Sequence, residues 1–245
     1  MAAQMINRIV IGLLLPLILS GLSACASVPE GTEHIADPLE GMNRSINRFN
    51  TDFDNTIAKP VAKGYQAITP DPLDRGFTNF FHNLADINSA ANNLFQLKPG
   101  RAITDVGRLC VNTTVGLLGF IDVASDIGMP EYKEDMGQTL GYWGYEESTY
   151  IMLPMLGPST VRDFIGKSGD VFMNPIYYTS EGIYWTLLAF RYVDLRADLL
   201  RASKVVDEAA IDPYAFVRES YLQKRRFDIY DGDPPLEDDP FLDDI

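Results

Sequence analysis

The sequence contains only two histidines and two cysteines among 245 residues. It also lacks the motifs of common catalytic sites: Gly-x-Ser-x-Gly, a phosphate-binding loop, Gly-x-Gly-x-x-Gly and His-Glu-x-x-His. His34 and His82 stand outside any motif, and His82 is expected to be a packing or surface residue of a helix. A carboxylate pair drawn from distant parts of the chain stays open, but no reaction is indicated. We therefore predict a protein that is not an enzyme, with no cofactor and no metal.

Basic residues are scarce as well. Twenty Lys and Arg are outnumbered by 34 Asp and Glu, which gives a formal net charge of −14. An acidic chain repels phosphate backbones, so we predict no nucleic-acid partner, and it gains nothing from an anionic membrane surface. Any membrane contact must then be apolar or covalent. Acids are densest in residues 231–245, which we expect to form a disordered tail without the spacing of a calcium loop.

The apolar run at the N-terminus is too short to cross a membrane. Ile9–Leu19 has 11 residues, whereas a transmembrane helix needs about 20. Arg8 precedes the run without any acid, and small residues follow it before Cys25. This layout is typical of a secretory signal. Two interpretations are open: cleavage near Ala24 beside an incidental cysteine, or a signal for lipid attachment.

The sequence LSAC at positions 22–25 resembles the bacterial lipobox, in which the cysteine is lipidated and becomes the mature N-terminus. Its position directly after the apolar run favours lipidation of Cys25. Acyl chains there would anchor the protein firmly, because each buried CH2 contributes about 0.8 kcal/mol. Residue 26 is alanine and not aspartate, which resembles the sorting signal of outer-membrane lipoproteins. We assign residues 1–24 to a lipoprotein signal peptide and 25–36 to a tether.

Helical spacing dominates the mature chain, and strict two-residue alternation is scarce. Asp-Pro pairs at Asp37, Asp71 and Asp212 predict helix starts, because Asp accepts first-turn amide protons and Pro suits the first helical position. Other helices are expected from Pro99 to about Leu118, over 159–172 and over 182–200. Apolar stripes follow the first two pairs: Met42, Ile46, Phe49, Phe53 and Ile57, then Phe77, Phe80, Phe81, Leu84, Ile87, Ala91, Leu94 and Phe95. The fold class is therefore all-α.

Three further segments have simple interpretations. Residues 137–159, rich in glycine and aromatics, cannot form a regular helix and are expected to be an ordered loop or a short extended segment. Cys110 lies in an apolar stretch and is expected in the core. The acid pair at 134–135 is expected to be a solvated loop.

The most apolar internal segment is VGLLGFIDVA, residues 115–124. Its two glycines permit close backbone approach. It is either the core helix of a soluble bundle or an exposed surface that contacts lipid, and periodicity does not decide between them. We select four residues as a candidate lipid-facing or channel-proximal segment: Leu117, Leu118, Phe120 and Ile121.

Seven blocks, in order, resemble the MlaA/VacJ family of outer-membrane lipoproteins. They are ADPLEGMNRSINRFN, KPVAKGY, GFTNFFHNL, VGLLGFIDVAS, GQTLGYWG, LPMLGPSTVRD and DPYAFVRESYLQKRR. Together they run from Ala36 to Arg226. The resemblance implies an MlaA-like helical domain over 37–230, followed by the acidic tail at 231–245.

The resemblance further implies a ring or disc of amphipathic helices lying in the membrane interface, embedded in the inner leaflet of the outer membrane and facing the periplasm. An amphipathic channel would take mislocalised phospholipid from the outer leaflet and pass it to the periplasmic carrier MlaC, which maintains lipid asymmetry. Trimeric porins would be partners. The alternative is a structural periplasmic lipoprotein that acts as an interaction scaffold, and a lipid hydrolase is least favoured because no nucleophile–base pair is visible.

Overall fold

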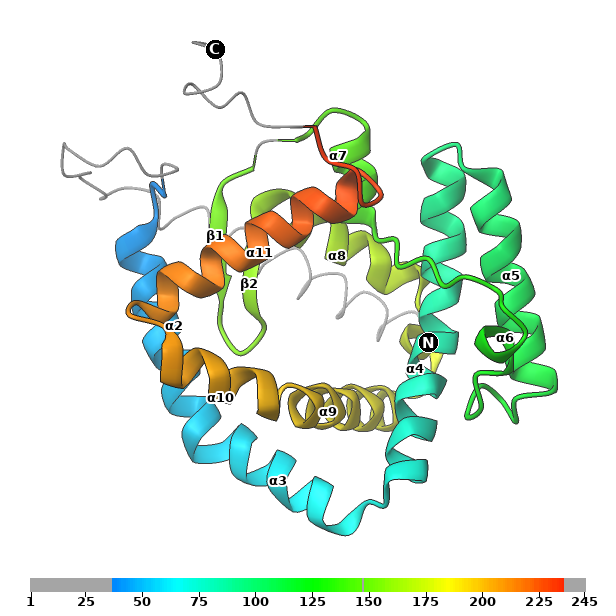
Figure 1. Cartoon of the computed structure of the whole chain (residues 1–245), viewed down its shortest axis with the longest axis horizontal. Coiled ribbons are helices and arrows are strands. Elements are labelled where there is room, and N and C mark those ends of the chain that lie inside the picture. Colours follow the sequence, from blue (N-terminus) through cyan, green and yellow to red (C-terminus); the bar gives the residue numbers. More distant parts are fainter. Residues whose placement is uncertain (1–36, 147, 236–245) are drawn as a thin grey trace.

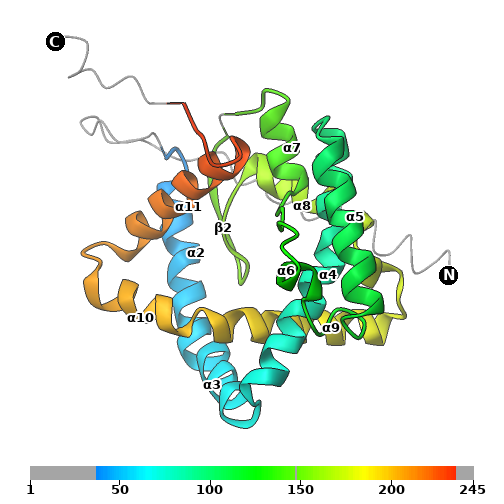
Figure 2. The same ribbon diagram turned by 45° about the vertical axis from the view of Figure 1, so that its right-hand side comes forward.

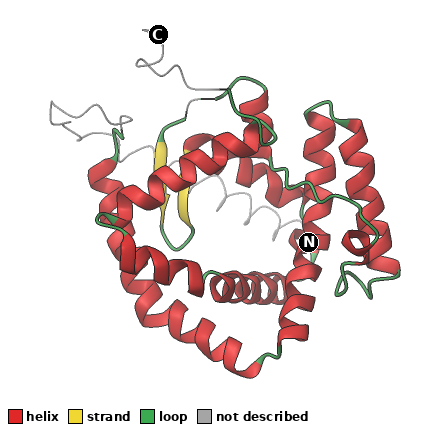
Figure 3. Cartoon of the chain, in the orientation of Figure 1, coloured by secondary structure: helices red, strands yellow, loops and turns green. Residues whose placement is uncertain are grey.

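The structure, a computed structural model, describes residues 37–146 and 148–235. It consists of helices and one two-stranded hairpin (Figure 3). The elements are α2 (Glu40–Phe53), η1 (Asp54–Ala58), α3 (Lys59–Ile68), α4 (Asp71–Phe95), α5 (Pro99–Thr114), α6 (Val123–Asp126), α7 (Met136–Tyr142), β1 (Tyr150–Leu153), β2 (Gly157–Thr160), α8 (Val161–Met173), η2 (Pro175–Tyr178), α9 (Glu181–Asp198), α10 (Leu200–Ala209) and α11 (Pro213–Ile229). The predicted all-α class is confirmed.

The helices form a ring (Figures 1 and 2). Helices α2, α3 and α4 follow one another around one side, and α7, α8 and α11 close the other side. Helix α9 runs beside α3 and α4, and the hairpin lies within the ring next to α2. Asp37, just before α2, accepts hydrogen bonds from Tyr214 and Arg218 of α11. The start and the end of the described chain are thereby joined, which closes the predicted ring.

Of the three Asp-Pro pairs, the one at Asp212 caps its helix as predicted. The Asp212 carboxylate accepts from the backbone N–H groups of Tyr214 at 3.1 Å and Ala215 at 3.3 Å. Asp37 accepts from the N–H of Leu39 in the turn before α2, but α2 itself begins after Leu39 without a side-chain cap. Asp71 does not cap α4: it is the first helical residue, and Pro70 precedes it without a side-chain cap. There the acid still suits the positive end of the helix dipole.

Helices α2 and α3 form one bent helix around Pro60. The backbone stays helical from Phe53 to Lys59, and the five-residue π-helical turn η1 lies between the two α-helices. Proline has no N–H to donate to the preceding turn and its ring crowds the carbonyl there. A π-helical turn widens the helix and bends it at such a point. The bend lets the chain curve around the ring.

Asparagines of α2 bind the hairpin as a third strand would. The Asn43 amide donates to the carbonyl of Tyr150 at 3.1 Å and accepts from the N–H of Met152 at 2.8 Å. Two turns later, Asn50 makes the same pair of bonds to Leu153 and Met155. A carboxamide offers the same donor and acceptor as a peptide group, so the free edge of β1 is satisfied. The polar face of α2 therefore points inward.

The helix predicted from Pro99 to about Leu118 ends earlier, at Thr114. The extended segment expected within residues 137–159 is present as the hairpin, but the expectation that no regular helix forms there is wrong, because α7 lies at its start. Glycines of α7 and α8 serve close packing: a Cβ on Gly166 would lie 2.3 Å from the backbone nitrogen of Gly137. Gly137 thus reflects helices in backbone contact, whereas Gly144 and Gly157 lie at turns with φ of 100° and 80°.

Candidate functional site

Polar side chains occupy much of the interior of this protein. The side chains that are fully or nearly fully buried include Asn43, Asn92, Asn93, Gln96, Asp105, Arg108, Asp163 and Asp194. Soluble proteins rarely bury so many polar and charged groups, and each one needs partners. Polar contacts hold much of the ring together, alongside a small buried apolar cluster of Tyr150, Met152 and Tyr214.

Large apolar side chains, in contrast, remain exposed around the ring. They include Phe49, Ile57, Val61, Ile68, Leu94, Phe95, Ile103, Val106, Leu117, Leu118, Trp143, Ile165, Phe172, Ile183, Trp185, Leu199 and Phe216. Single exposed apolar residues are ordinary, but extensive exposed apolar surface marks a site of contact with protein or membrane. On α2 the exposed residue Phe49 belongs to the predicted apolar stripe. The stripe is therefore divided: Phe49 and Ile57 are exposed, whereas Ile46 packs against the apolar cluster of the hairpin and α11.

The segment after α5 forms a strained loop and not a helix. Leu117 and Leu118 have φ values of 53° and 61°, and Gly119 follows at 91°. This left-handed region costs a residue other than glycine roughly 1–2 kcal/mol. The loop is held by backbone bonds from Gly119 N–H to the Asn112 carbonyl and from Ile121 N–H to the Gly116 carbonyl, at 2.8 and 2.9 Å. Strain that the surroundings maintain is typical of functional segments.

The loop separates the four residues chosen from the sequence. Leu117 and Leu118 are each 66% exposed and Ile121 is 47% exposed. Phe120 instead turns inward, with its ring 5.6 Å from Phe77 and 5.7 Å from Phe80 between centroids. Three of the four thus form an exposed apolar tip, and the fourth ties that tip to α4. Their contact with lipid stays a prediction.

Cys110, on α5, is exposed, so the expected core position was wrong. It lies on the outward side of the helix, where Ile103 and Val106 are also exposed. The apolar residues near Cys110 in the sequence, such as Ile103 and Val106, therefore lie on the outer surface of the ring rather than in its interior.

A buried ionic network joins α4 to α5. Asp105 accepts from Ser89 Oγ at 2.9 Å and from Asn93 Nδ2 at 2.8 Å. Arg108 donates to Asp122, and its Nε lies 3.7 Å from Asp86 Oδ2. Within the described residues, neither of these last two atoms has a hydrogen-bond partner. Burial, opposed by Arg108, raises the pKa of Asp86 to about 7.

Replacing Asp86 with asparagine is expected to stabilise the protein at pH 8 and to change little at pH 4. A raised pKa means that the folded state holds the proton more tightly, so the stability from protonated Asp86 is complete below pH 4 and is lost as pH rises through about 7. We expect a gain of about 2 kcal/mol at pH 8, since one pKa unit corresponds to about 1.4 kcal/mol and the new amide stays buried. Thermal unfolding of the full chain in detergent across this pH range measures it. Asp52→Asn, at an exposed position, is the control, and a variant destabilised at pH 8 would contradict the prediction.

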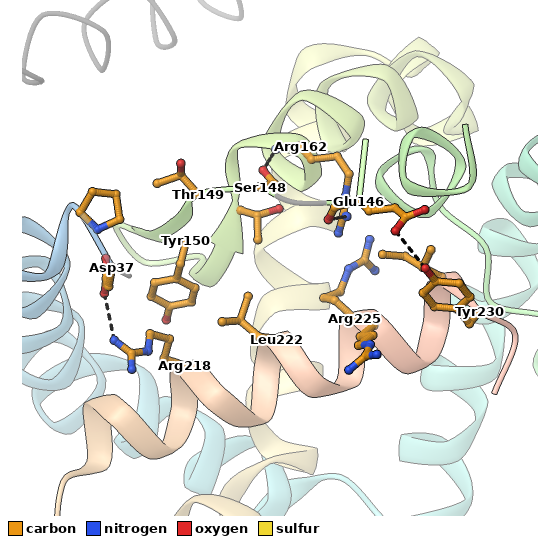
Figure 4. Close-up of a pocket in the computed structure, with 14 residues that line it drawn as sticks. Asp37, Glu146, Ser148, Thr149, Tyr150, Arg162, Arg218, Leu222, Arg225 and Tyr230 are labelled. Carbon is orange, nitrogen blue, oxygen red and sulfur yellow. Dashed lines mark hydrogen bonds and ion pairs between the residues drawn. The ribbon is translucent and has the colours of Figure 1, made fainter. Parts of the chain in front are cut away.

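An arginine-lined cleft of about 850 Å³ lies between α11 and the start of the hairpin (Figure 4). Arg218, Leu222 and Arg225 point into it from α11, toward Tyr150 and Arg162. Its arginines are engaged with acids: Arg162 with Asp163 and Arg218 with Asp37. The cleft is therefore a joint that fastens α11 to the rest of the ring.

Arg225 provides the strongest part of this joint. Its guanidinium binds Asp135 at 2.7 and 2.8 Å and Asp163 at 2.9 and 3.1 Å. Burial alone would raise the pKa of both carboxyls, but the bonds to Arg225 hold each pKa below its usual range. Asp135 also caps α7 through the N–H of Gln138 at 2.8 Å. One side chain thus connects three helices.

The acid pair at 134–135 is therefore not a solvated loop. Glu134 is buried and accepts from Gln96 at 2.9 Å, and Asp135 is bound by Arg225. Asp231, the first residue of the expected tail, pairs with Lys98 and Arg101. These contacts lie between residues about 40 to 130 positions apart, which spacing along the sequence does not reveal.

No group of three or more His, Cys, Asp or Glu side chains in residues 37–146 and 148–235 is placed to hold a metal ion. His82 lies on α4 with Nδ1 3.3 Å from Glu131 Oε1, a surface contact in line with its expected role. Among the helices of the described chain, none combines the length and the apolar character needed to span a membrane.

Residues 35–228 match the profile of the MlaA lipoprotein family. The chain belongs to the MlaA lipoprotein family. Two relatives with the name intermembrane phospholipid transport system lipoprotein MlaA support this. The Haemophilus influenzae protein is 34% identical, with 80% of each chain covered. The Escherichia coli protein is 31% identical, with 89% of this chain and 88% of the relative covered.

The fold agrees with an MlaA relationship too. A solved structure, described as the structural basis for maintenance of bacterial outer membrane lipid asymmetry, superposes with a TM-score of 0.71 at 32% identity. The match covers 80% of this chain and all of that chain. The family resemblance of the seven blocks is thereby confirmed.

Cys25, the signal peptide and the tether lie outside the described residues, as do residues 236–245. The domain limits and the lipid-facing or channel-proximal role of Leu117, Leu118, Phe120 and Ile121 stay predictions. The sequence interpretation missed Asn50 as a partner of the hairpin and Arg225 as a connector of three helices.

Proposed function

We propose that this protein is an outer-membrane lipoprotein that removes mislocalised phospholipid from the outer leaflet and so maintains lipid asymmetry. Membership of the MlaA family supports the transport role, because MlaA relatives carry a name of that meaning. The main support for placing the protein in a membrane is the distribution of polar and apolar side chains. Polar residues such as Asn43 and Asp105 are buried, while apolar residues such as Leu117 and Trp185 are exposed. A soluble scaffold would leave this apolar surface in water.

The proposed location is the inner leaflet, with the ring embedded and one face toward the periplasm. Transfer of exposed apolar surface into lipid contributes about 25 cal/mol per Å², so the outward side chains favour insertion. Exposed Trp143 and Trp185 suit the boundary between headgroups and hydrocarbon, where indole is enriched. Lipid on Cys25 would deliver the chain to this membrane and add to the attachment.

The proposed route for phospholipid is an amphipathic channel through the ring. A phosphate buried without a partner costs several kcal/mol, so such a route needs polar atoms for the headgroup and apolar surface for the tails. The ring has both, in the polar inner faces of its helices and in the aromatic cluster around Phe77. The carrier MlaC would receive the lipid and a trimeric porin would hold the ring. In this proposal the protein itself catalyses no reaction. Hydrolysis of phospholipid by the purified protein, abolished by one substitution, would show instead that it is an enzyme.

Deletion of the gene is expected to raise the amount of phospholipid in the outer leaflet, because its removal route is lost. The measurement is a leaflet-selective phospholipid assay on deletion and complemented strains. An unchanged outer leaflet would reject the transport role.

Replacing Cys25 with serine separates the anchor from the ring. We expect the variant to be sorted poorly but to stay with membranes after carbonate washing, because the apolar outer surface still binds lipid. The wild-type protein processed in the same way is the control. Full release of the variant into buffer would instead favour a soluble scaffold held only by its lipid.

A further inference from the structure

Arg191 on α9 is a cation without a carboxylate partner. Its guanidinium carbon lies 5.8 Å from the centroid of the Phe81 ring. No hydrogen bond or ion pair to Arg191 occurs within the part of the chain that the structure describes. Five residues later on the same helix, Arg196 binds Asp54 through Nη2 at 2.7 Å. Arg196 is thus paired with an acid, whereas Arg191 of the same helix is not.

The acid one turn away does not compensate Arg191. Asp194 is buried and accepts from Tyr65 Oη of α3 at 3.1 Å and from Thr78 Oγ1 of α4 at 3.3 Å. Its two oxygens are therefore directed to neighbouring helices. The attraction of Asp194 is outweighed by burial, which lowers the pKa of Arg191. The guanidinium keeps all its donors for another group.

Arg191 adjoins an aromatic cluster. Phe190, the preceding residue, has its ring centroid 4.7 Å from Phe77, 5.8 Å from Tyr65 and 6.1 Å from Phe81. Phe77 and Phe80 also contact Phe120, which ties the cluster to the strained loop. A cation beside a set of apolar rings matches a molecule with an anionic group next to hydrocarbon. A planar guanidinium binds phosphate oxygens through two parallel hydrogen bonds.

We propose that Arg191 binds the phosphate of a glycerophospholipid as it passes along α9, with the aromatic cluster of Tyr65, Phe77, Phe81 and Phe190 contacting the adjoining hydrocarbon. This inference rests on the proposed transport function. Free phosphate shares the anionic chemistry but gains nothing from the rings. The two ligands should therefore differ in affinity, which the test uses.

The experiment titrates the purified full chain in detergent with dihexanoylphosphatidylglycerol and follows binding by phosphorus NMR. Arg191→Met is expected to weaken binding at least about tenfold, which corresponds to about 1.4 kcal/mol, because it removes a charge-assisted hydrogen bond to the phosphate. Arg191→Lys keeps the positive charge but cannot donate two parallel hydrogen bonds from one planar group. Its affinity for the lipid should lie between those of the wild type and Arg191→Met. Arg75→Met removes an exposed cation of α4 and should bind as the wild type does. Inorganic phosphate at the same concentration should not bind.

Thermal stability separates a ligand role from a structural one. Arg191→Met should raise the unfolding temperature, because it removes a desolvated and unpaired charge. Equal lipid affinity in Arg191→Met, or equally strong binding of inorganic phosphate, would overturn the inference. So would a fall in unfolding temperature together with lost binding.

The same variants in the deletion strain keep the two proposals apart. Failure of the wild-type gene to restore the outer leaflet would reject the transport function. Restoration by the wild type and equally by Arg191→Met would reject only the role of Arg191. Restoration by Arg75→Met but not by Arg191→Met supports it.

Discussion

Replacing Arg225 with methionine is expected to destabilise the ring by about 3–5 kcal/mol, the usual cost of removing one partner from a buried ion pair. The change deletes four hydrogen bonds and leaves Asp135 and Asp163 without their main partner. Because Asp135 also caps α7, we expect α7 and α11 to separate first. Denaturant unfolding in detergent gives the free energy, and hydrogen exchange locates the opening.

The pH dependence checks the cause of this loss. Asp135 and Asp163 have lowered pKa values in the folded state, so their contribution is present above pH 4 and is lost as pH falls further. The difference between Arg225→Met and the wild type should therefore shrink in acid. Lys224→Met removes a neighbouring surface ion pair with Asp228 and should change stability by under about 1 kcal/mol. A difference that stays constant from pH 7 to pH 3 would point to lost packing instead.

Replacing both Leu117 and Leu118 with asparagine is expected to abolish most phospholipid removal while preserving the fold. Asparagine tolerates positive φ better than leucine does, so the loop should keep its shape. Each exposed leucine can contribute about 1.5–3 kcal/mol on burial in lipid, and the pair holds the two most exposed positions of the tip. Outer-leaflet phospholipid in the complemented deletion strain is the measurement.

The matched control for the loop is Leu117→Met/Leu118→Met, which keeps apolar tips on the same strained backbone. It should restore the outer leaflet nearly as well as the wild type. Purified protein of both variants should unfold within about 1 kcal/mol of the wild type, since the positions are exposed. Full activity of the asparagine variant would show that the loop does not need an apolar surface.

These predictions share one physical theme: the ring keeps polar groups inside and apolar groups outside. Buried pairs such as Arg225 with Asp163 hold helices together where a soluble protein would use an apolar core. This arrangement leaves several buried or partly buried charged groups without a full set of hydrogen-bond partners, among them Asp86 and Arg191. The Asp86 side chain lies between α4 and α5, near Arg108, and Arg191 lies beside the Phe81 ring.

The sequence predicted the helical class, most helix positions and the family. It could do so because amphipathic spacing and Asp-Pro starts are local signals: Asp212 caps α11 as its neighbours require. The helix expected through Leu118 failed for a tertiary reason. Gly116 and Gly119 let the chain fold back against Asn112 and Asn83, and a Cβ on Gly119 would lie 2.6 Å from the Asn83 side chain.

By itself, then, the sequence determined that this chain forms amphipathic helices in the order of an MlaA protein. Only the tertiary structure decided which side of each helix faces inward. Periodicity defines two faces but not the medium that each one meets, so Phe49 could be read as core until it was found exposed, with Asn43 and Asn50 bound to the hairpin. Partners far apart in the chain, such as Arg225 and Asp135, leave no local signal because closing the ring alone brings them together.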